Sequence, residues 1–190
     1  MATLQEMANF IATALANAAT YGDAAHQALH DRLTGLPNRA LLMDRVDQAM
    51  AKARRHRTGL ALLFIDLDNF KTVNDVHGHL AGDQLLKGVA AELGRQLRET
   101  DTLARLGGDE FVLLCEGLSR DAMAAVRERV LGAVLRAVDA SPAFAGVAAS
   151  VGAWWSDGQE PGADEVLSRA DAEMYRVKRE QKGRPGPVRP

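Results

Sequence analysis

The sequence predicts an α+β fold, in which helices cover a sheet that is at least partly antiparallel. Apolar strand-like runs alternate with segments of helical periodicity along most of the 190-residue chain. Two of these runs, residues 101–106 and 111–115, are neighbours joined by a Gly-Gly pair, which is typical of a β-hairpin. The hairpin supplies an antiparallel pair, and the intervening helices cover the sheet.

The period of the apolar residues predicts each element in turn. Strands are predicted over residues 60–65, 101–106, 111–115 and 145–155, and helices over residues 41–53, 81–97, 121–138 and 163–178. The run at residues 60–65 is apolar throughout, as expected for a strand buried on both faces, and it ends at Asp66.

The first thirty residues differ from those that follow. Apolar residues recur there at seven-residue intervals, with alanine in half of these positions. The pattern predicts a helix over residues 1–30 that either pairs two protomers or packs on its own domain, and both alternatives stay open. A turn-rich connector follows at residues 31–39, where Gly35 and Pro37 interrupt any helix and predict a domain boundary. The tail, residues 185–190, is expected to be frayed.

Composition excludes several classes of protein. A formal net charge of −2 offers no surface suited to a nucleic-acid backbone. No stretch has the apolar length of a membrane span, and no signal peptide opens the chain. The single cysteine, Cys115, cannot form an internal disulfide. We therefore expect a cytoplasmic protein without a nucleic-acid partner.

Candidate chemistry is concentrated at the predicted hairpin, where Gly107, Gly108, Asp109 and Glu110 are consecutive. Glycine lets the backbone come close to a ligand, and two adjacent carboxylates suit a phosphate ester with its divalent metal ion. From these four residues alone, an ordinary hairpin with solvated acids is an equal alternative.

A second cluster begins at Asp66, because a carboxylate at the end of a buried strand needs a cation or hydrogen-bond donors. A calcium loop that starts at Asp66 is excluded, since its sixth position is Lys71 rather than glycine and its twelfth is His77 rather than glutamate. Asn74 and Asp83 carry groups that can bind the N1 and N2 hydrogens of guanine. From the pattern alone they are equally turn and cap residues.

Three ordered motifs together resemble the GGDEF domain family, the diguanylate cyclase module of bacteria. They are Asp-Arg-Leu-Thr-Gly-Leu-Pro-Asn-Arg at residues 31–39, the Asp-x-Phe-Lys to Gly-Asp motif at residues 68–83, and Arg-Leu-Gly-Gly-Asp-Glu-Phe at residues 105–111. The resemblance implies a domain over residues 31–184 with a mainly antiparallel five-stranded sheet surrounded by helices, related to the polymerase palm and to nucleotidyl cyclases. Residues 1–30 also resemble the last helix of a GAF sensor domain.

The resemblance implies that two GTP molecules are condensed into cyclic di-GMP, with release of two pyrophosphates, across a homodimer of domains. Mg²⁺ is the implied cofactor, and Mn²⁺ is an implied substitute. The side chain of Asp66, the carbonyl of Leu67 and the side chain of Asp109 are the implied metal ligands. Asp109 is also implied to help deprotonate the 3′-hydroxyl, while Glu110 and Lys71 complete the catalytic set by supporting the metal site and steadying phosphate charge.

The resemblance also implies contacts to the nucleotide. The implied guanine ligands are Asn74 and Asp83, and the residues implied to lie at the phosphates are Phe70, Gly107, Gly108 and Lys178. Beyond Lys178 the sequence departs from the family pattern, so a second basic phosphate ligand is left open between Lys182 and Arg184.

A further implied site binds the product. Arg98 and Asp101 form an Arg-x-x-Asp string at the spacing that the family uses for inhibition by cyclic di-GMP, with Arg129 as a further contact. A charged helix end is the alternative. Two alternatives to an enzyme stay open: a silent GGDEF module that senses GTP or cyclic di-GMP, and a scaffold for dimerisation. The intact acidic residues favour the enzyme.

Overall fold

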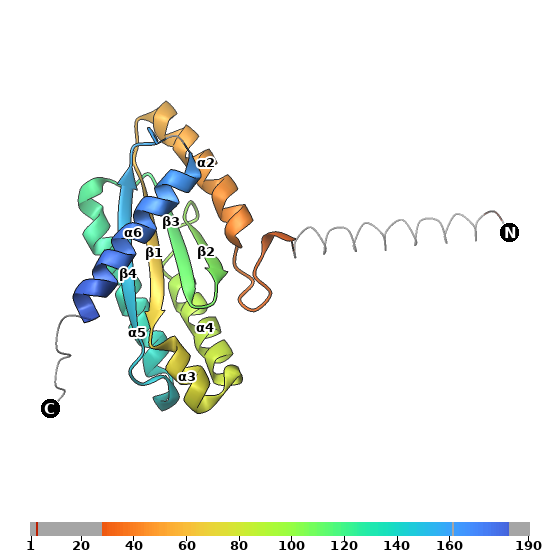
Figure 1. Cartoon of the computed structure of the whole chain (residues 1–190). Coiled ribbons are helices and arrows are strands. Elements are labelled where there is room, and N and C mark those ends of the chain that lie inside the picture. Colours follow the sequence, from red (N-terminus) through yellow and green to blue (C-terminus); the bar gives the residue numbers. More distant parts are fainter. Residues whose placement is uncertain (1–2, 4–27, 161, 183–190) are drawn as a thin grey trace.

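The computed structural model describes residues 3, 28–160 and 162–182. The predicted N-terminal helix lies outside these residues except for Thr3 and residues 28–30, and so does the tail after residue 182. The described chain forms an antiparallel sheet with strand order β2-β3-β1-β4 and helices on both faces (Figure 1). The predicted α+β class is confirmed.

The elements have the following bounds in chain order: α2 (Arg39–His56), β1 (Leu60–Asp68), α3 (Phe70–His77), α4 (His79–Gly94), β2 (Thr102–Gly107), β3 (Glu110–Glu116), α5 (Met123–Asp139), β4 (Ala148–Ser156) and α6 (Ala163–Lys182). Short 3₁₀ turns precede α5 and β4. Every strand and helix predicted after the connector is present, with ends that differ by a few residues.

Three features differ from the sequence-based expectation. The described residues form four strands rather than five, with β4 at an edge of the sheet. Helix α3 is not predicted by periodicity, because its apolar residues are few and only Val73 among them is buried. Asp66 does not end its strand, since β1 continues to Asp68.

The side chains of β1 alternate between two cores. Odd-numbered residues such as Ile65 pack with α4 and α5, whereas even-numbered residues such as Phe64 pack with α2 and α6. Helices on both faces explain why the strand is apolar along most of its length. The even-numbered face of β1 then changes from apolar to acidic, because Asp66 and Asp68 follow Phe64 on that face.

Helix α6 lies directly on β4, and Gly152 makes this contact possible. A Cβ atom at Gly152 would lie 1.9 Å from the backbone nitrogen of Met174, so no side chain fits there. Met174 is four residues before Lys178 on the same helix. The close contact therefore fixes the position along β4 at which Lys178 reaches the sheet.

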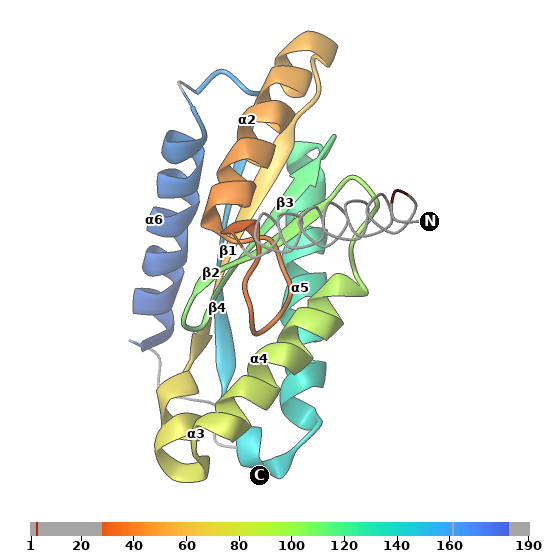
Figure 2. The same ribbon diagram turned by 90° about the vertical axis from the view of Figure 1, so that its right-hand side faces the viewer.

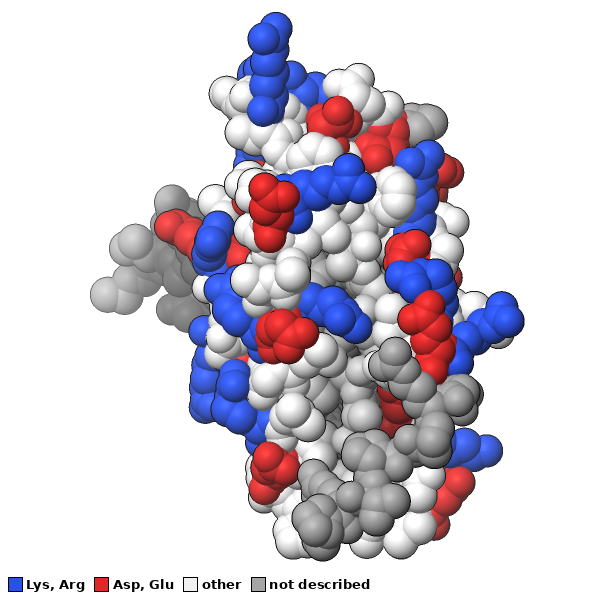
Figure 3. All heavy atoms as spheres, turned by 90° about the vertical axis from the view of Figure 1, so that its left-hand side faces the viewer, with Lys and Arg blue, Asp and Glu red and all other residues white. Residues whose placement is uncertain are grey.

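The surface is mixed in charge. On the face seen from the left of Figure 1, acidic and basic side chains of the described residues are interspersed (Figure 3). This distribution agrees with the small net charge of the chain. Within the described residues, no helix has the length and apolar character needed to cross a membrane.

Replacement of Gly152 by alanine should push α6 away from β4. We expect Gly152→Ala to lower the free energy of unfolding by about 1–3 kcal/mol, the usual cost of overpacking. The cost arises because the atoms in the way belong to the helix backbone and not to a flexible side chain. Urea denaturation measures the change.

Gly132→Ala on α5 is the matched control. A Cβ atom there would lie 3.5 Å from the end of the Arg136 side chain, and alanine favours a helix over glycine. We expect the control to be at least as stable as the wild type. A Gly152→Ala variant of wild-type stability would show that this contact does not fix α6.

Candidate active site

The candidate active site lies where β1 ends beneath the turn of the β2–β3 hairpin. Asp66 is paired with Glu110 on β3 and with Ser150 on β4. The amide of Leu67 donates to the carbonyl of Asp109 at 3.3 Å, which joins the turn to the end of β1. The structure thereby gathers the three acids of the predicted site.

The turn depends on its two glycines. Gly107 has a φ of 148° and Gly108 a φ of 51°, values that side chains disfavour. The register shifts between Arg105 and Gly107, as in a β-bulge, which re-aims the end of the hairpin. Apart from the glycine itself and its chain neighbours, no described atom lies within 4 Å of the Cβ position of either glycine, so the backbone is open to a ligand.

Arg105 ties this turn to the loop of residues 31–37. Its guanidinium donates to the Gly108 carbonyl at 2.7 and 3.1 Å, and to Oδ1 of Asp31 at 2.9 Å. The same Asp31 oxygen accepts from the amide and the hydroxyl of Thr34. Figure 2 shows the loop lying beside β2. Sequence reasoning missed these contacts of Arg105, although Asp31 and Arg105 are each the first residue of one of the three motifs.

Lys178 of α6 brings a positive charge to the acids. Its Nζ atom lies 2.5 Å from Oδ1 of Asp66 and 3.8 Å from Oδ1 of Asp68. Burial alone would lower the pKa of Lys178, but the hydrogen bond and the charge of Asp66 raise it above its ordinary value of 10.5. Of the two further basic candidates, Lys182 ends α6 and Arg184 lies outside the described residues.

The acids repel one another. Burial and the charge of Asp66 raise the pKa of Asp109, and burial with the same charge raises the pKa of Glu110. Carboxylates this close favour a cation between them. Their oxygen atoms are the hard ligands that divalent ions such as Mg²⁺ and Mn²⁺ prefer, so the donor set fits such an ion.

The protein groups alone are too few for a complete metal shell. Among the described residues, no three or more His, Cys, Asp or Glu side chains are grouped to hold a metal ion. Mg²⁺ is commonly bound by one or two carboxylates together with substrate phosphates and water. The expected ligands Asp66, Asp109 and the carbonyl of Leu67 agree with that mode of binding.

The predicted guanine ligands lie on α3 and α4. A Cβ atom at Gly82 would lie 2.0 Å from Oδ1 of Asn74 and 3.1 Å from the ring of Phe70, so Asn74 packs directly on the backbone of α4. Asp83 follows Gly82 and is half-buried, whereas Lys71 is exposed. Gly82 belongs to the second motif, but the motif does not indicate that this glycine packs against Asn74.

The start of α3 offers backbone amides. Asn69 precedes this helix with a φ of 64°, and its side chain donates to the Gly146 carbonyl at 3.0 Å instead of capping the helix. The Thr72 amide donates to the Asn69 carbonyl at 3.0 Å, so the amides of Phe70 and Lys71 are the ones that another acceptor can meet. Phosphate oxygens are acceptors that helix N-termini commonly bind.

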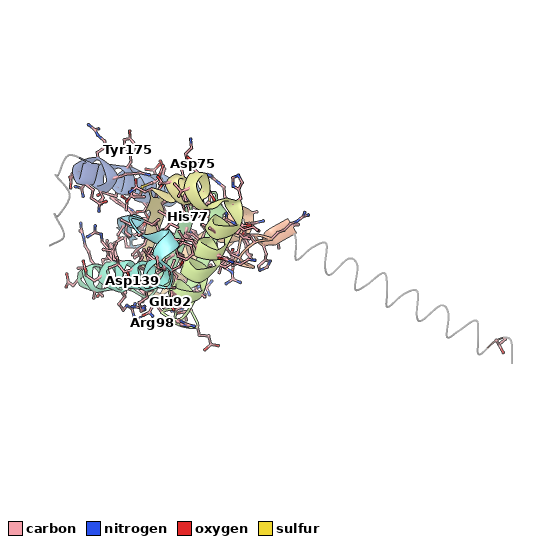
Figure 4. The ribbon with its side chains drawn as sticks, turned by 90° about the horizontal axis from the view of Figure 1, so that it is seen from below. Asp75, His77, Glu92, Arg98, Asp139 and Tyr175 are labelled. Atoms are coloured by element: carbon pink, nitrogen blue, oxygen red, sulfur yellow. The ribbon has the colours of Figure 1, made fainter. Side chains whose placement is uncertain are left out.

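The three residues of the predicted product site lie around β3, apart from the acids. The Arg98 amide donates to Oδ2 of Asp101 at 3.0 Å, while Oδ1 of Asp101 is buried with no partner among the described residues. Burial and the charge of Asp101 raise the pKa of the Cys115 thiol to about 12, against the opposing charges of Arg129 and Arg98. The charges of all three residues therefore act on the same thiol of β3. Figure 4 shows Arg98 on the α4–α5 side and Tyr175 on the α6 side.

Carboxylates, an ammonium group and an open glycine turn meet at the end of an antiparallel sheet, a combination of groups that suits a metal-bound phosphate. Comparison with known proteins then gives the family. The family described as "Diguanylate cyclase, GGDEF domain" matches residues 28–184. The chain belongs to this family, as its three motifs predicted.

Individual relatives agree with this assignment. Diguanylate cyclase DgcP of Pseudomonas aeruginosa is 44% identical over 165 residues, which are 83% of this chain and 23% of DgcP. The bifunctional diguanylate cyclase/cyclic di-GMP phosphodiesterase MucR of the same organism is 41% identical over 175 residues, or 92% of this chain and 25% of MucR. The chain thus spans about a quarter of these relatives.

A solved structure covers nearly the whole chain. The coiled coil and GGDEF domain of DgcB from Caulobacter crescentus, in complex with c-di-GMP, matches with a TM-score of 0.82 and 27% identity. The match covers 97% of each chain. It places the sheet and helices described above in a fold already known for this family.

The contact between Asp31 and Arg105 predicts a pH dependence of stability. Burial alone would raise the pKa of Asp31, but hydrogen bonds from Thr34 and Arg105 hold it below its ordinary value of 3.8. A lowered pKa stabilises the folded state above pH 3.8, and this contribution is lost as the pH falls through the folded-state pKa. We expect Asp31→Asn to unfold more readily than the wild type at neutral pH, and the difference to shrink below pH 3.8.

Urea denaturation over this pH range measures the difference. Asp44→Asn, at an exposed carboxylate on α2, is the matched control and should track the wild type throughout. A difference between Asp31→Asn and the wild type that stays constant with pH would contradict the role of this ion pair.

Proposed function

We propose that the domain is a diguanylate cyclase, which condenses two GTP molecules into cyclic di-GMP and releases two pyrophosphates. One observation carries the proposal: Asp66, Asp109 and Glu110 meet Lys178 beneath the glycine turn. Carboxylates for a metal, an ammonium group and exposed backbone together match the charges of a metal–triphosphate. The names of DgcP and MucR support the same activity.

In the proposed reaction, the 3′-hydroxyl of each GTP attacks the α-phosphate of the other. Asp66, Asp109 and the carbonyl of Leu67 would hold Mg²⁺, for which Mn²⁺ can substitute. The bound metal supplies charge neutralisation and makes a bound hydroxyl easier to ionise. The Asp109 carboxylate accepts the hydroxyl proton, and Glu110 supports the acidic cluster from the adjoining position on β3.

The remaining predicted residues orient the nucleotide. The Asp83 carboxylate accepts from N1 and N2 of guanine, and the Asn74 amide, held against Gly82, contacts the same base. The residues proposed to contact or position the phosphates are Phe70, Lys71, Gly107, Gly108 and Lys178. In-line positioning of this kind is the main contribution that a protein makes to phosphoryl transfer.

Two domains have to cooperate, because each proposed site holds one GTP and the product contains two guanosines. We therefore include a homodimer in the proposal, with the two glycine turns facing each other. The predicted helix over residues 1–30 would raise the effective concentration of one domain near the other. A cytoplasmic location, where GTP is abundant, stays a prediction.

We also propose that Arg98, Asp101 and Arg129 bind cyclic di-GMP as an inhibitor. The buried Oδ1 atom of Asp101 is an acceptor without a donor among the described residues, and guanine carries suitable N–H groups. The two guanidinium groups near Cys115 suit the phosphates of the product.

Asp109→Ala tests the enzyme. We expect the variant to lose at least about a hundredfold in turnover, because it lacks both a metal ligand and the proton acceptor. GTP binding should survive in part. Cyclic di-GMP and pyrophosphate are quantified after incubation with GTP and Mg²⁺ over a range of protein concentrations.

Asp164→Ala, at an exposed acid on α6, is the matched control and should retain activity. Wild-type turnover by Asp109→Ala would refute the assigned role. If the wild-type chain itself binds GTP at every concentration but forms no product, the domain is a silent sensor rather than a cyclase.

Arg98→Ala tests the product site. We expect the variant to keep converting GTP, while the concentration of cyclic di-GMP that halves the rate rises at least about tenfold through loss of a charged contact. Arg95→Ala, at an exposed arginine three residues earlier, should leave the inhibition unchanged. Inhibition curves with added product decide the matter, and coincident curves for Arg98→Ala and wild type would count against the site.

A further inference from the structure

Ser150 and Asp68 form a polar pair to which the proposed function assigns no role. Ser150 is fully buried, and its hydroxyl donates to Oδ2 of Asp68 at 2.8 Å. Its oxygen also lies 3.0 Å from the side-chain oxygen of Gln181 on α6. A buried hydroxyl is costly unless it is hydrogen-bonded, so the bond to Asp68 holds that carboxylate in one orientation.

The pair lies beside the candidate active site. Ser150 is directly opposite Asp66 in the β1–β4 ladder, and Asp68 follows two residues later on the same face of β1. Both acids lie within reach of the ammonium group of Lys178, at 2.5 Å for Asp66 and 3.8 Å for Asp68. Lys178 is thus shared between a proposed metal ligand and a second carboxylate that is fixed by a serine.

Binding of a metal–nucleotide would affect the carboxylates of Asp66 and Asp68 differently. A divalent ion at Asp66 repels a nearby ammonium group and competes with it for the same oxygen atoms. Asp68 is then the acid that remains for Lys178. A lysine side chain has several freely rotating bonds and loses entropy when its ammonium group is held against phosphate. A fixed carboxylate beside the ammonium group reduces that loss.

We infer that Ser150 and Asp68 are positioning residues for Lys178: the serine hydroxyl fixes the Asp68 carboxylate, and Asp68 keeps the ammonium group at the triphosphate while Asp66 holds metal. The inference rests on the proposed function, because it requires a triphosphate at this site. Gly152 sets the position of the helix backbone, and the serine–aspartate pair sets the end of the side chain.

The test is a double-mutant cycle on nucleotide binding in the full chain. The probe is a GTP analogue with a methylene group between the α- and β-phosphates, which cannot release pyrophosphate. We expect Ser150→Ala to raise the Kd of this analogue by roughly fivefold to tenfold, the effect of losing one ordinary hydrogen bond. In the Lys178→Met background the same substitution should have no further effect.

Asp68→Asn provides a second route to the same result. It keeps the shape of the side chain and removes its charge, so it should weaken binding at least as much as Ser150→Ala and should also lose its effect in the Lys178→Met background. If Ser150→Ala fails to fold by circular dichroism, the Asp68→Asn cycle decides alone.

Ser156→Ala is the matched control, because Ser156 is a buried serine on the same strand whose hydroxyl bonds to Glu160. It should alter stability without altering the Kd of the analogue. Unchanged analogue binding in both test variants, or equal weakening with and without Lys178, would overturn the inference and leave a purely structural pair. So would a wild-type chain that does not bind the analogue.

Failure of the inference and failure of the proposed function give different results. A chain that forms cyclic di-GMP but shows no coupling to Lys178 overturns only the positioning role. A chain that binds the analogue with the expected coupling, yet forms no product from GTP, overturns the cyclase and retains the positioning role in a nucleotide sensor.

Discussion

The ion pair between Asp66 and Lys178 links the packing of helix α6 to the chemistry proposed for the site. A buried carboxylate within the inner strand β1 is costly by itself, and Asp109 and Glu110 add repulsion. The balancing charge comes from the last helix, so it is present only when α6 is packed on β4 through Gly152. Because the same oxygen atoms are the proposed metal ligands, nucleotide binding has to redistribute the charges of this pair.

The glycine turn is held from its other side by Arg105. Two glycines give the turn the conformation it needs, but they also leave it many alternatives in the absence of further contacts. The bonds from Arg105 to Gly108 and Asp31 remove part of that freedom. The backbones of His30 and Pro37 also form a β-bridge. The segment that leads into the domain is therefore linked, through a short series of bonded groups, to the turn that carries the proposed catalytic acid.

Local features of the fold could be predicted, because they depend on neighbouring residues: the Gly-Gly hairpin, the apolar strand before Asp66 and the long amphipathic helices. The short polar helix α3 could not, since only Val73 of it is buried. The contacts that complete the site join residues 74, 82 and 112 positions apart, in the pairs Asp31–Arg105, Asp68–Ser150 and Asp66–Lys178. Periodicity does not specify such pairs. The family resemblance implied that Lys178 belongs to the site, but it implied neither the Asp31–Arg105 pair nor the Asp68–Ser150 pair.

The positions of the two proposed sites constrain how product can inhibit the enzyme. Glu110 lies opposite Asp66 of β1, on the sheet face that is covered by α6. Cys115, which is affected by the charges of Arg98 and Arg129, packs in the core with α4 and α5 on the other face. The six-residue strand β2 separates Asp101 from the glycine turn by roughly 20 Å. Cyclic di-GMP bound at the proposed second site would therefore not compete with GTP for the same groups of one domain. In the proposed reaction, inhibition would act through the β2–β3 hairpin or on the encounter of two domains. The second route follows from the proposal that the reaction needs two domains.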